Sequence, residues 1–350
     1  MRVVVVGATG NVGTAVLRRL AAEPEVDSVV GIARRPPADP RQPYDIASWQ
    51  AVDVSAADAR ARLGAAFAGA DSVVAVAWRL QPSWDLGALQ RINVEGTRAA
   101  LDAAMAAGVP HVAYASSIGA YAPSPGDERR DESWPTTGAP TSTYSRQKAE
   151  VERILDGIDG GTGSARLGVL RVRPGIVLQP DAAAEIARFF LGPLVPTSLL
   201  RPALVPVLPW PRGVRVPVVH ADDLADAIVR GLVARATGGL NVSTEPVVGA
   251  NLLGRLLTAR PVDVPPAAVR ALAAVTWRAH LQPSEPGWLD LAKGLPIMDT
   301  TRARTELGWS PAHGVEEAMR EFLSALARGR GGESPVLVGR TARSGRRAPG

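Results

Sequence analysis

Tyr144 and Lys148 stand four residues apart and are the residues best suited to do chemistry together. The chain of 350 residues has two lysines, and all its other side chains that are cationic at neutral pH are arginines. Residues i and i+4 share one face of a helix, so the phenol and the ammonium would project together. A nearby cation favours the phenolate and lowers the pKa of a phenol from about 10. The spacing therefore predicts a proton-transfer pair for carbinol and carbonyl chemistry.

A glycine-rich turn, Gly-Ala-Thr-Gly-Asn-Val-Gly, follows the apolar run at residues 2–6 and precedes an amphipathic stretch. The first glycine permits a tight turn, the second lets backbone approach a pyrophosphate, and the third lets helix and strand pack closely. The helix N-terminus then offers free N–H groups to the anion. The turn predicts dinucleotide binding by Gly7, Thr9, Gly10, Asn11, Val12 and Gly13.

The end of the second apolar run favours one dinucleotide over the other. An acid there would hold the ribose 2′-hydroxyl of NAD, whereas an arginine suits the 2′-phosphate of NADP. Ala33 stands at this position, and Arg34 and Arg35 follow it. We therefore expect NADP in preference to NAD, with a solvated basic turn as the alternative. Asp53 and Val54, after the third run, are placed at the adenine, although Asp53 also suits a helix N-cap shared with Ser55.

Composition excludes several classes of protein. The chain has no cysteine and only four scattered histidines, so disulfide frameworks, thiolate chemistry and a metal site are not expected. Residues 328–350 contain six arginines and one glutamate, which account for the whole net charge of +5. We expect this tail to be disordered and the protein to bind no nucleic acid. No signal peptide or long apolar run is present, so we expect no membrane span and a cytoplasmic location.

Apolar runs alternate with amphipathic stretches along the first half of the chain. Strands that alternate with helices predict an α/β fold with a Rossmann-type, doubly wound parallel sheet. The expected strands are 2–6, 27–33, 49–54, 72–77, 111–115 and 166–172, and the expected helices are 12–22, 86–107 and 144–156. Beyond about residue 175 the pattern is irregular, with a strand near 214–219 and helices near 222–234, 249–258, 265–280, 301–307 and 315–327.

These patterns divide the chain into three parts. Residues 1–175, with segments near 214–242, are assigned to the dinucleotide-binding domain. A smaller C-terminal substrate-binding lobe is assigned to about 176–213 and 243–327. Residues 328–350 form the basic tail.

Taken in order, the motifs resemble those of the extended short-chain dehydrogenase/reductases, which include NAD-dependent epimerases and dehydratases. The motifs are the glycine turn, Asp53-Val54, Asn93-Val-Glu-Gly-Thr97, Ser116-Ser117, Tyr144-x-x-x-Lys148, Arg173-Pro-Gly175, Val219-His-Ala-Asp-Asp223 and Asp299 to Trp309. The resemblance runs from residue 1 to about 326.

The resemblance implies roles for individual residues. Tyr144 would be the acid/base, and Lys148 would hold the nicotinamide ribose and lower the pKa of Tyr144. Ser117 would hydrogen-bond the substrate oxygen, with Ser116 as the alternative, and Asn93 would orient this region. Further cofactor contacts are expected from Ala75, Ala77, Pro174 and Ile176.

Some residues depart from the family pattern and bear on the substrate. Many members have a histidine where this chain has Ala75, and residues 171–179 lack the segment typical of nucleotide-sugar enzymes. Residues 189–211 are apolar and proline-rich, which suits either a lid for a hydrophobic substrate or a loop that covers the core or a dimer contact. Candidate pocket walls lie on loops near the expected site: Trp78, Gln81, Trp84, Ser116 and Trp134.

The sequence thus predicts an NADP-preferring oxidoreductase that interconverts a carbonyl and a secondary alcohol on a small or hydrophobic substrate. One alternative is a nucleotide-sugar epimerase or dehydratase that retains NAD. Another is a non-catalytic dinucleotide sensor. The resemblance also implies a homodimer formed through the helices near 86–107 and 144–156.

Overall fold

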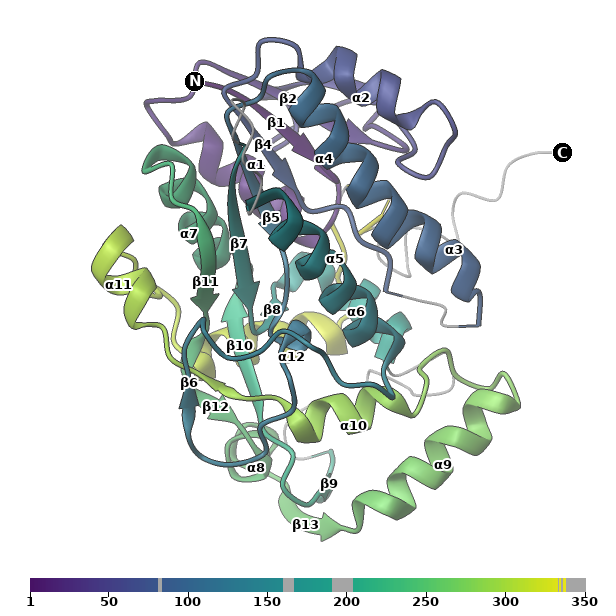
Figure 1. The fold of residues 1–350 in the computed structure, drawn as a ribbon. Helices are drawn as coiled ribbons and strands as arrows, with labels where there is room; N and C mark the ends of the chain where they lie inside the picture. Colours follow the sequence, from purple (N-terminus) through teal and green to yellow (C-terminus); the bar gives the residue numbers. More distant parts are fainter. Residues whose placement is uncertain (81–83, 160–166, 191–203, 333, 335, 338–350) are drawn as a thin grey trace, which may run out of the picture.

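A seven-stranded parallel sheet forms the centre of the molecule (Figure 1). The computed structural model describes residues 1–80, 84–159, 167–190, 204–332, 334, 336 and 337. The strand order is β11-β7-β5-β4-β1-β2-β3, which is the arrangement of a doubly wound sheet. The strands are β1 Arg2–Val6, β2 Ser28–Ala33, β3 Ala47–Ala51, β4 Ser72–Ala75, β5 His111–Ala115, β7 Gly168–Pro174 and β11 Gly238–Val242.

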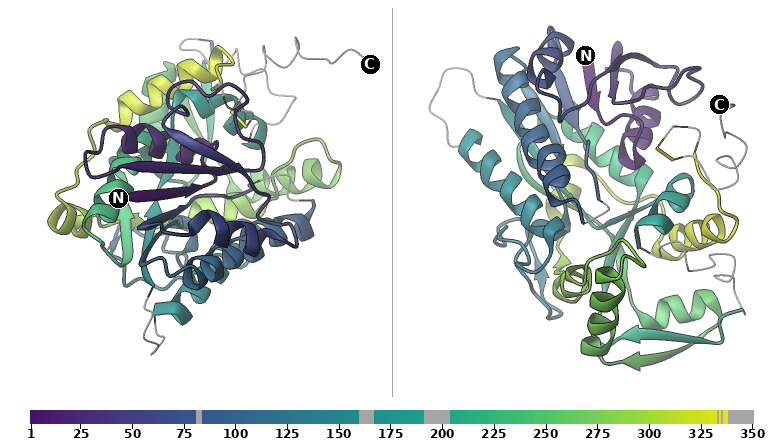
Figure 2. Two further views of the ribbon diagram at one scale, coloured as in Figure 1. Left: turned by 90° about the horizontal axis from the view of Figure 1, so that it is seen from above. Right: turned by 90° about the vertical axis from the view of Figure 1, so that its right-hand side faces the viewer.

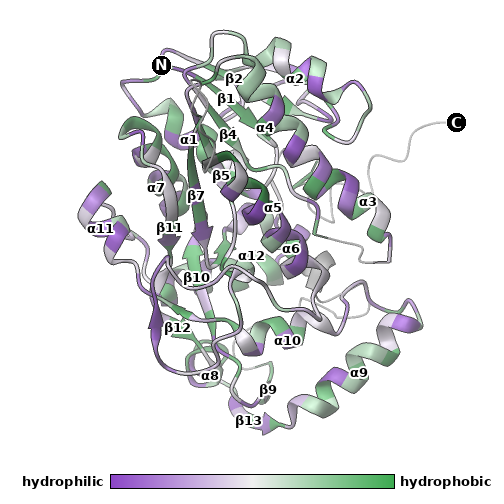
Figure 3. Cartoon of the chain, in the orientation of Figure 1, coloured by the Kyte–Doolittle hydropathy of each residue, from purple (hydrophilic) through white to green (hydrophobic). Residues whose placement is uncertain are grey.

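Helices cover both faces of this sheet, as the view from above in Figure 2 shows. Because the inner strands are buried on both faces, most of their residues are apolar rather than alternating with polar ones. Figure 3 shows this hydrophobic centre. One face packs on α1 Asn11–Ala21 and α7 Ala221–Val233. The other packs on α2 Ala59–Phe67, α4 Gly96–Ala106 and α5 Thr143–Asp159. The expected α/β fold with a Rossmann-type sheet is confirmed.

A smaller second region follows β7. Its three-stranded sheet is built from β8 Ile176–Leu178, β10 Val216–His220 and β12 Thr244–Val248. Helices α6 Ala183–Phe190, α8 Ala250–Leu257 and α12 Val315–Ala327 accompany this sheet, and an apolar cluster lies between them. The remaining elements are β6 Arg129–Arg130, β9 Val207–Pro211, β13 Arg260–Val264, α9 Pro266–Arg278, α10 Gly287–Gly294, β14 Ile297–Met298 and α11 Thr301–Leu307.

The long helix expected at 86–107 is interrupted. It consists of α3 Leu86–Gln90, a π-helical turn at Arg91–Glu95, and then α4. The third strand ends at Ala51, three residues before the expected end at residue 54. Among the described residues, no helix is long and apolar enough to cross a membrane.

The first part of the tail differs from the expected disorder. The described residues Ser334 and Leu337 have no exposed surface. The Ser334 hydroxyl donates to the Thr9 carbonyl at 2.7 Å, and Arg330 pairs with Asp181 at 3.2 Å. Residues 338–350 lie outside the described residues, so the expectation of disorder stays a prediction for them.

Candidate active site

A cleft of about 610 Å³ lies where the strands of the central sheet end at their carboxyl termini. Ligands bind at this edge in open α/β sheets. The cleft contains most of the residues selected from the sequence: Gly7, Thr9, Gly10, Asn11, Val12, Arg34, Arg35, Asp53, Val54, Ala77, Trp78, Ser116, Ser117, Tyr144, Lys148, Pro174 and Ile176.

The glycine turn has the geometry that an anion site requires. Gly7 has φ +91°, and a Cβ there would lie 2.6 Å from the Ala77 nitrogen. A Cβ on Gly13 would overlap the Gly7 carbonyl oxygen, so that glycine lets α1 approach β1. No side chain caps α1 at Gly10, so its first N–H groups stay open to a ligand. This cradle fits the pyrophosphate of a dinucleotide.

The Asn11 side chain has a different partner from the one expected. Its amide donates to the Val177 carbonyl at 3.3 Å and accepts from Gln179 at 2.6 Å. Asn11 therefore ties the phosphate turn to β8 of the second region.

Arg34 and Arg35 lie at the end of β2 and are exposed at the mouth of the cleft. Asp53 accepts hydrogen bonds from the Ser55 amide at 3.0 Å and from its hydroxyl at 2.6 Å. These bonds, helped by the charge of Arg34, lower the pKa of the Asp53 carboxyl. The N-cap of α2 is Asp58, so Asp53 does not cap that helix.

Tyr144, Ser117 and Lys148 meet inside the cleft. Tyr144 and Lys148 lie in α5, and Ser117 follows β5. The Ser117 hydroxyl accepts from the Gly119 amide at 2.9 Å and lies close enough to the Tyr144 phenol to lower its pKa. The Lys148 ammonium donates to the Ala115 carbonyl at 2.7 Å and to the Tyr114 hydroxyl at 3.2 Å.

The expected lowering of the Tyr144 pKa is not found in this structure. Burial raises it to about 12, and the hydrogen bond from Ser117 only partly opposes this. Burial also holds the pKa of Lys148 well below its ordinary value, although the charge of Glu152 raises it. Desolvation disfavours both charged forms and outweighs any attraction between phenolate and ammonium.

Glu152 forms a buried ion network behind the site. Its carboxylate accepts from Ser116 at 2.5 Å, from Arg173 at 2.9 Å through both oxygens, and from Arg171 at 3.3 Å. Burial opposes ionisation of Glu152, but the hydrogen bonds and charge of Arg173 hold its pKa below the ordinary value. The Ser116 hydroxyl is thus bonded to a carboxylate, whereas the Ser117 hydroxyl lies beside the phenol.

Several expected site residues do not line the cleft. Asn93 is buried, accepts from the Arg79 amide at 2.7 Å and donates to the Arg79 carbonyl at 2.9 Å, so it holds the loop after β4. Ala75 is the buried last residue of β4, and Gly13 acts through packing. The Trp134 indole donates to the Ala122 carbonyl at 3.0 Å, away from the lining. Gln81 lies outside the described residues.

The sequence did not single out two residues that contact Tyr144. The Trp288 ring stacks on the Tyr144 ring with 4.9 Å between centroids. A Cβ on Gly119 would lie 2.8 Å from the Tyr144 ring, so that glycine makes room for the phenol. Trp288 belongs to no motif, and nearness in space was the only signal that could have identified it.

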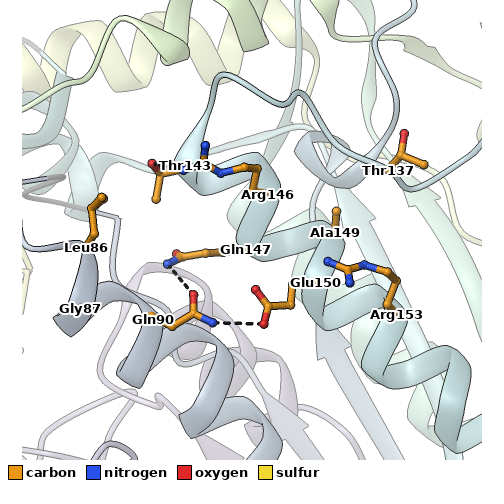
Figure 4. Close-up of a pocket in the computed structure, with 10 residues that line it drawn as sticks. All are labelled: Leu86, Gly87, Gln90, Thr137, Thr143, Arg146, Gln147, Ala149, Glu150 and Arg153. Carbon is orange, nitrogen blue, oxygen red and sulfur yellow. Dashed lines mark hydrogen bonds between the residues drawn. The ribbon is translucent and has the colours of Figure 1, made fainter.

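A second hollow of about 520 Å³ lies on the outer side of α3 and α5 (Figure 4). In it, Gln147 donates to Gln90 at 3.4 Å and Gln90 donates to Glu150 at 3.1 Å. Gln147 also accepts a hydrogen bond from Asn93 at 2.9 Å. Because the Asn93 side chain also bonds the backbone of Arg79, which lines the cleft, it connects this polar surface to the cleft. Within the described part of the chain, no group of three or more His, Asp and Glu side chains could hold a metal ion.

Comparison with known proteins bears on the family of this chain. The model of the NAD dependent epimerase/dehydratase family matches residues 3–242. A 3-diazoavenalumate denitrifying reductase from a Streptomyces species is 30% identical, and the match covers 89% of this chain and 97% of that protein. An uncharacterised protein of Mycobacterium tuberculosis is 30% identical over 160 residues, which cover 44% of this chain and 41% of that protein.

Solved structures share the fold at lower identity. The dTDP-glucose 4,6-dehydratase DesIV of Streptomyces venezuelae, with NAD bound, has a TM-score of 0.71 at 20% identity and covers 96% of this chain and 100% of its own. A short-chain dehydrogenase/reductase superfamily protein of Agrobacterium tumefaciens, also with NAD bound, has a TM-score of 0.68 at 20% identity. The match covers 99% of this chain and 100% of that protein. With the family match over most of its length and a relative of similar size, the chain belongs to the NAD-dependent epimerase/dehydratase family.

Proposed function

We propose that the protein is an NAD(P)-dependent oxidoreductase that interconverts a carbonyl and a secondary alcohol. The observation that carries this proposal is that the phosphate turn, the Tyr144 phenol and the Ser117 hydroxyl share one cleft. When bound, the dinucleotide would supply or accept the hydride, and the protein supplies position and proton transfer.

In this proposal, Ser117 and Tyr144 bind the carbonyl oxygen, and the phenol gives its proton to that oxygen as the alcohol forms. A pKa of about 12 keeps the phenol protonated at neutral pH, which is the form needed for reduction. Lys148 would hold the ribose of the nicotinamide, and Asn93 positions the loop beside it. In the reverse direction, Tyr144 takes the alcohol proton.

We test the acid/base assignment with Tyr144→Phe, which keeps the ring but removes the hydroxyl. Turnover should fall about 100-fold or more, while the dissociation constant for NADPH stays close to that of the wild type. Normal turnover by this variant would refute the acid/base role of Tyr144. The non-catalytic sensor instead predicts no turnover by the wild type and unchanged dinucleotide binding by the variant.

We further propose that NADP is preferred over NAD. This rests on Arg34 and Arg35 at the cleft mouth and on the absence of an acid at the end of β2. A 2′-phosphate would gain charge-assisted hydrogen bonds from these guanidinium groups. The test compares NADPH and NADH binding in the wild type, Arg34→Ala and Arg35→Ala. An unchanged preference in both variants would remove the argument.

A second candidate function is a nucleotide-sugar epimerase or dehydratase with tightly bound NAD. The solved neighbours favour it, because they include a dTDP-glucose dehydratase with NAD bound. This candidate expects the cofactor to stay with the protein through purification and no net consumption of NADPH. Release of the dinucleotide after mild unfolding, followed by its identification, separates the two functions.

We also propose a cytoplasmic homodimer in which α4 and α5 of two copies pack together. These helices lie side by side on one flank of the sheet (Figure 1). Light scattering after size exclusion tests the dimer, and a monomeric mass at micromolar concentration would exclude it.

A further inference from the structure

The cleft ends beside Tyr144 in a region walled by aromatic and aliphatic side chains. We infer that this region is the substrate subsite and that it binds a flat aromatic or conjugated carbonyl compound without a phosphate group. The inference rests on the proposed function, because it assigns the substrate of the same site.

Two tryptophans flank the reacting phenol. The Trp288 ring lies 4.9 Å from the Tyr144 ring at an interplanar angle of 30°. The Trp78 ring meets the same phenol edge-on, with 6.0 Å between the ring centroids and an interplanar angle of 81°. Both indoles line the cleft, and both geometries are those that aromatic pairs prefer. A planar substrate can extend this arrangement by stacking in the same way.

Helix α10 turns one apolar face to the cleft. Trp288, Leu291 and Ala292 line the cleft, and their spacing of i, i+3 and i+4 marks one side of the helix. Leu295, which ends the helix, also lines the cleft. The charged residues of α10 are not part of this lining. Asp290 pairs instead with Arg270 of α9 at 3.0 Å. The helix therefore offers hydrocarbon and indole surface where a substrate would extend away from Tyr144.

Most cations of the cleft belong to the side assigned to the dinucleotide. Arg34 and Arg35 follow β2, and the charge of Arg34 acts on Asp53. The Lys148 ammonium is buried and lies 3.5 Å from the centre of the Trp78 ring. Arg79 is the remaining cation of the described lining, and one guanidinium supplies fewer donors than a diphosphate requires.

The second region supplies no cation to the described lining of the cleft. Its one charged contribution there is Glu185 of α6, which would repel a diphosphate. Because an anion needs fixed cationic or N–H donors when water is excluded, a nucleotide sugar is poorly matched to this wall. An uncharged aromatic ketone or aldehyde is well matched.

The experiment measures ligand binding rather than turnover. Wild-type protein saturated with NADP⁺, which cannot reduce a ketone, is titrated calorimetrically with 2-acetonaphthone and with UDP-glucose. We expect saturable binding of the ketone and none of UDP-glucose. Trp288→Ala should weaken ketone binding about tenfold, whereas Trp288→Phe, which keeps a stacking ring, should stay within about threefold.

Trp84→Ala is the matched control, because Trp84 is 37% exposed and does not line the cleft. All three variants should bind NADPH as the wild type does, which shows that they are folded. Saturable binding of UDP-glucose, or ketone binding that is absent or unchanged in Trp288→Ala, would overturn the inference.

The outcomes also separate this inference from the proposed reaction. Trp288-dependent ketone binding without any turnover by NADPH would refute the reaction and keep the subsite. Turnover of UDP-glucose would refute the subsite and support the epimerase or dehydratase function.

Discussion

Glu152 places a fixed negative charge one helical turn beyond Lys148 on α5. Its carboxylate is buried and held ionised by Arg173. Burial lowers the pKa of Lys148, and the charge of Glu152 is what opposes that effect. At the residue scale, the protonation state of Lys148 therefore depends on a residue that lines no part of the cleft.

The effect of the Glu152 charge on the pKa of Lys148 has a defined direction. Glu152→Gln removes the charge that favours the ammonium, so the pKa of Lys148 falls further. If protonated Lys148 is required, the alkaline limb of kcat/KM against pH should move down by about one pH unit. Glu150→Gln, on the same helix but bonded to Gln90, is the control and should leave the limb in place. An identical profile for both variants would contradict the role of Glu152.

Gly13→Ala tests the packing of the phosphate turn. The added methyl group would collide with the Gly7 carbonyl oxygen, so α1 must move away from β1. We expect stability to fall by about 1–3 kcal/mol and NADPH binding to weaken more than tenfold.

Gly64→Ala supplies the contrast. A Cβ at Gly64 of α2 meets no atom within 4 Å, so this variant should gain about 0.5–1 kcal/mol from helix propensity. Chemical denaturation of both variants measures the two effects. Equal changes in the free energy of unfolding would show that the close contact at Gly13 does not destabilise the variant.

At the scale of elements, local patterns predicted much of the architecture. The buried run at Arg2–Val6, the glycine turn and the start of α5 at Thr143–Asp159 each depend on nearby residues, and each was found. The π-helical turn at Arg91–Glu95 was not expected, because helical periodicity alone carries no sign of it. Such turns occur often at functional sites.

Contacts between distant residues explain what the sequence could not show. Asn93 lies in the π-helical turn and bonds the backbone of Arg79, fourteen positions away. Trp288 reaches Tyr144 only because α10 folds back over the cleft. The raised pKa of Tyr144 depends on burial that no spacing reveals. The motifs thus selected residues that share one cleft, while folding determined their environment.

Asn93→Ala tests the link between the π-helical turn and the loop after β4. The change removes the bonds to Arg79 and to Gln147 and leaves buried polar groups unpaired. Stability should fall by about 1–3 kcal/mol, and kcat/KM should fall because the loop that carries Trp78 loses its anchor. Asn251→Ala, at an exposed position of α8, is the control for thermal unfolding and kinetics. No difference between the two variants would refute the anchoring role.

At the scale of the whole molecule, described residues from near the two ends of the chain meet at the cleft. Ser334 donates to the carbonyl of Thr9, 325 positions earlier, and Val336 lines the cleft. Composition predicted disorder here, because arginine and glycine dominate the tail. A few apolar residues within it are enough to change the outcome, since Leu337 is completely buried.

Leu337→Ala tests whether this terminal segment supports dinucleotide binding. Removing a fully buried leucine side chain should cost about 2–5 kcal/mol if the segment unfolds together with the rest of the protein. Leu281→Ala, at a leucine that is 49% exposed, is the matched control and should change stability little. Thermal unfolding is measured with and without saturating NADPH, and the dissociation constant is measured for both variants.

Thermal stability and NADPH affinity together show how the segment around Ser334 and Leu337 acts. If it is part of the cofactor site, Leu337→Ala should weaken NADPH binding, and the stabilisation by NADPH at a fixed concentration should shrink with it. Ser334→Ala, which removes the bond to the phosphate turn, should act in the same direction. If Leu337→Ala matches Leu281→Ala in both stability and affinity, the contact between the chain ends contributes neither to folding nor to the binding of the dinucleotide.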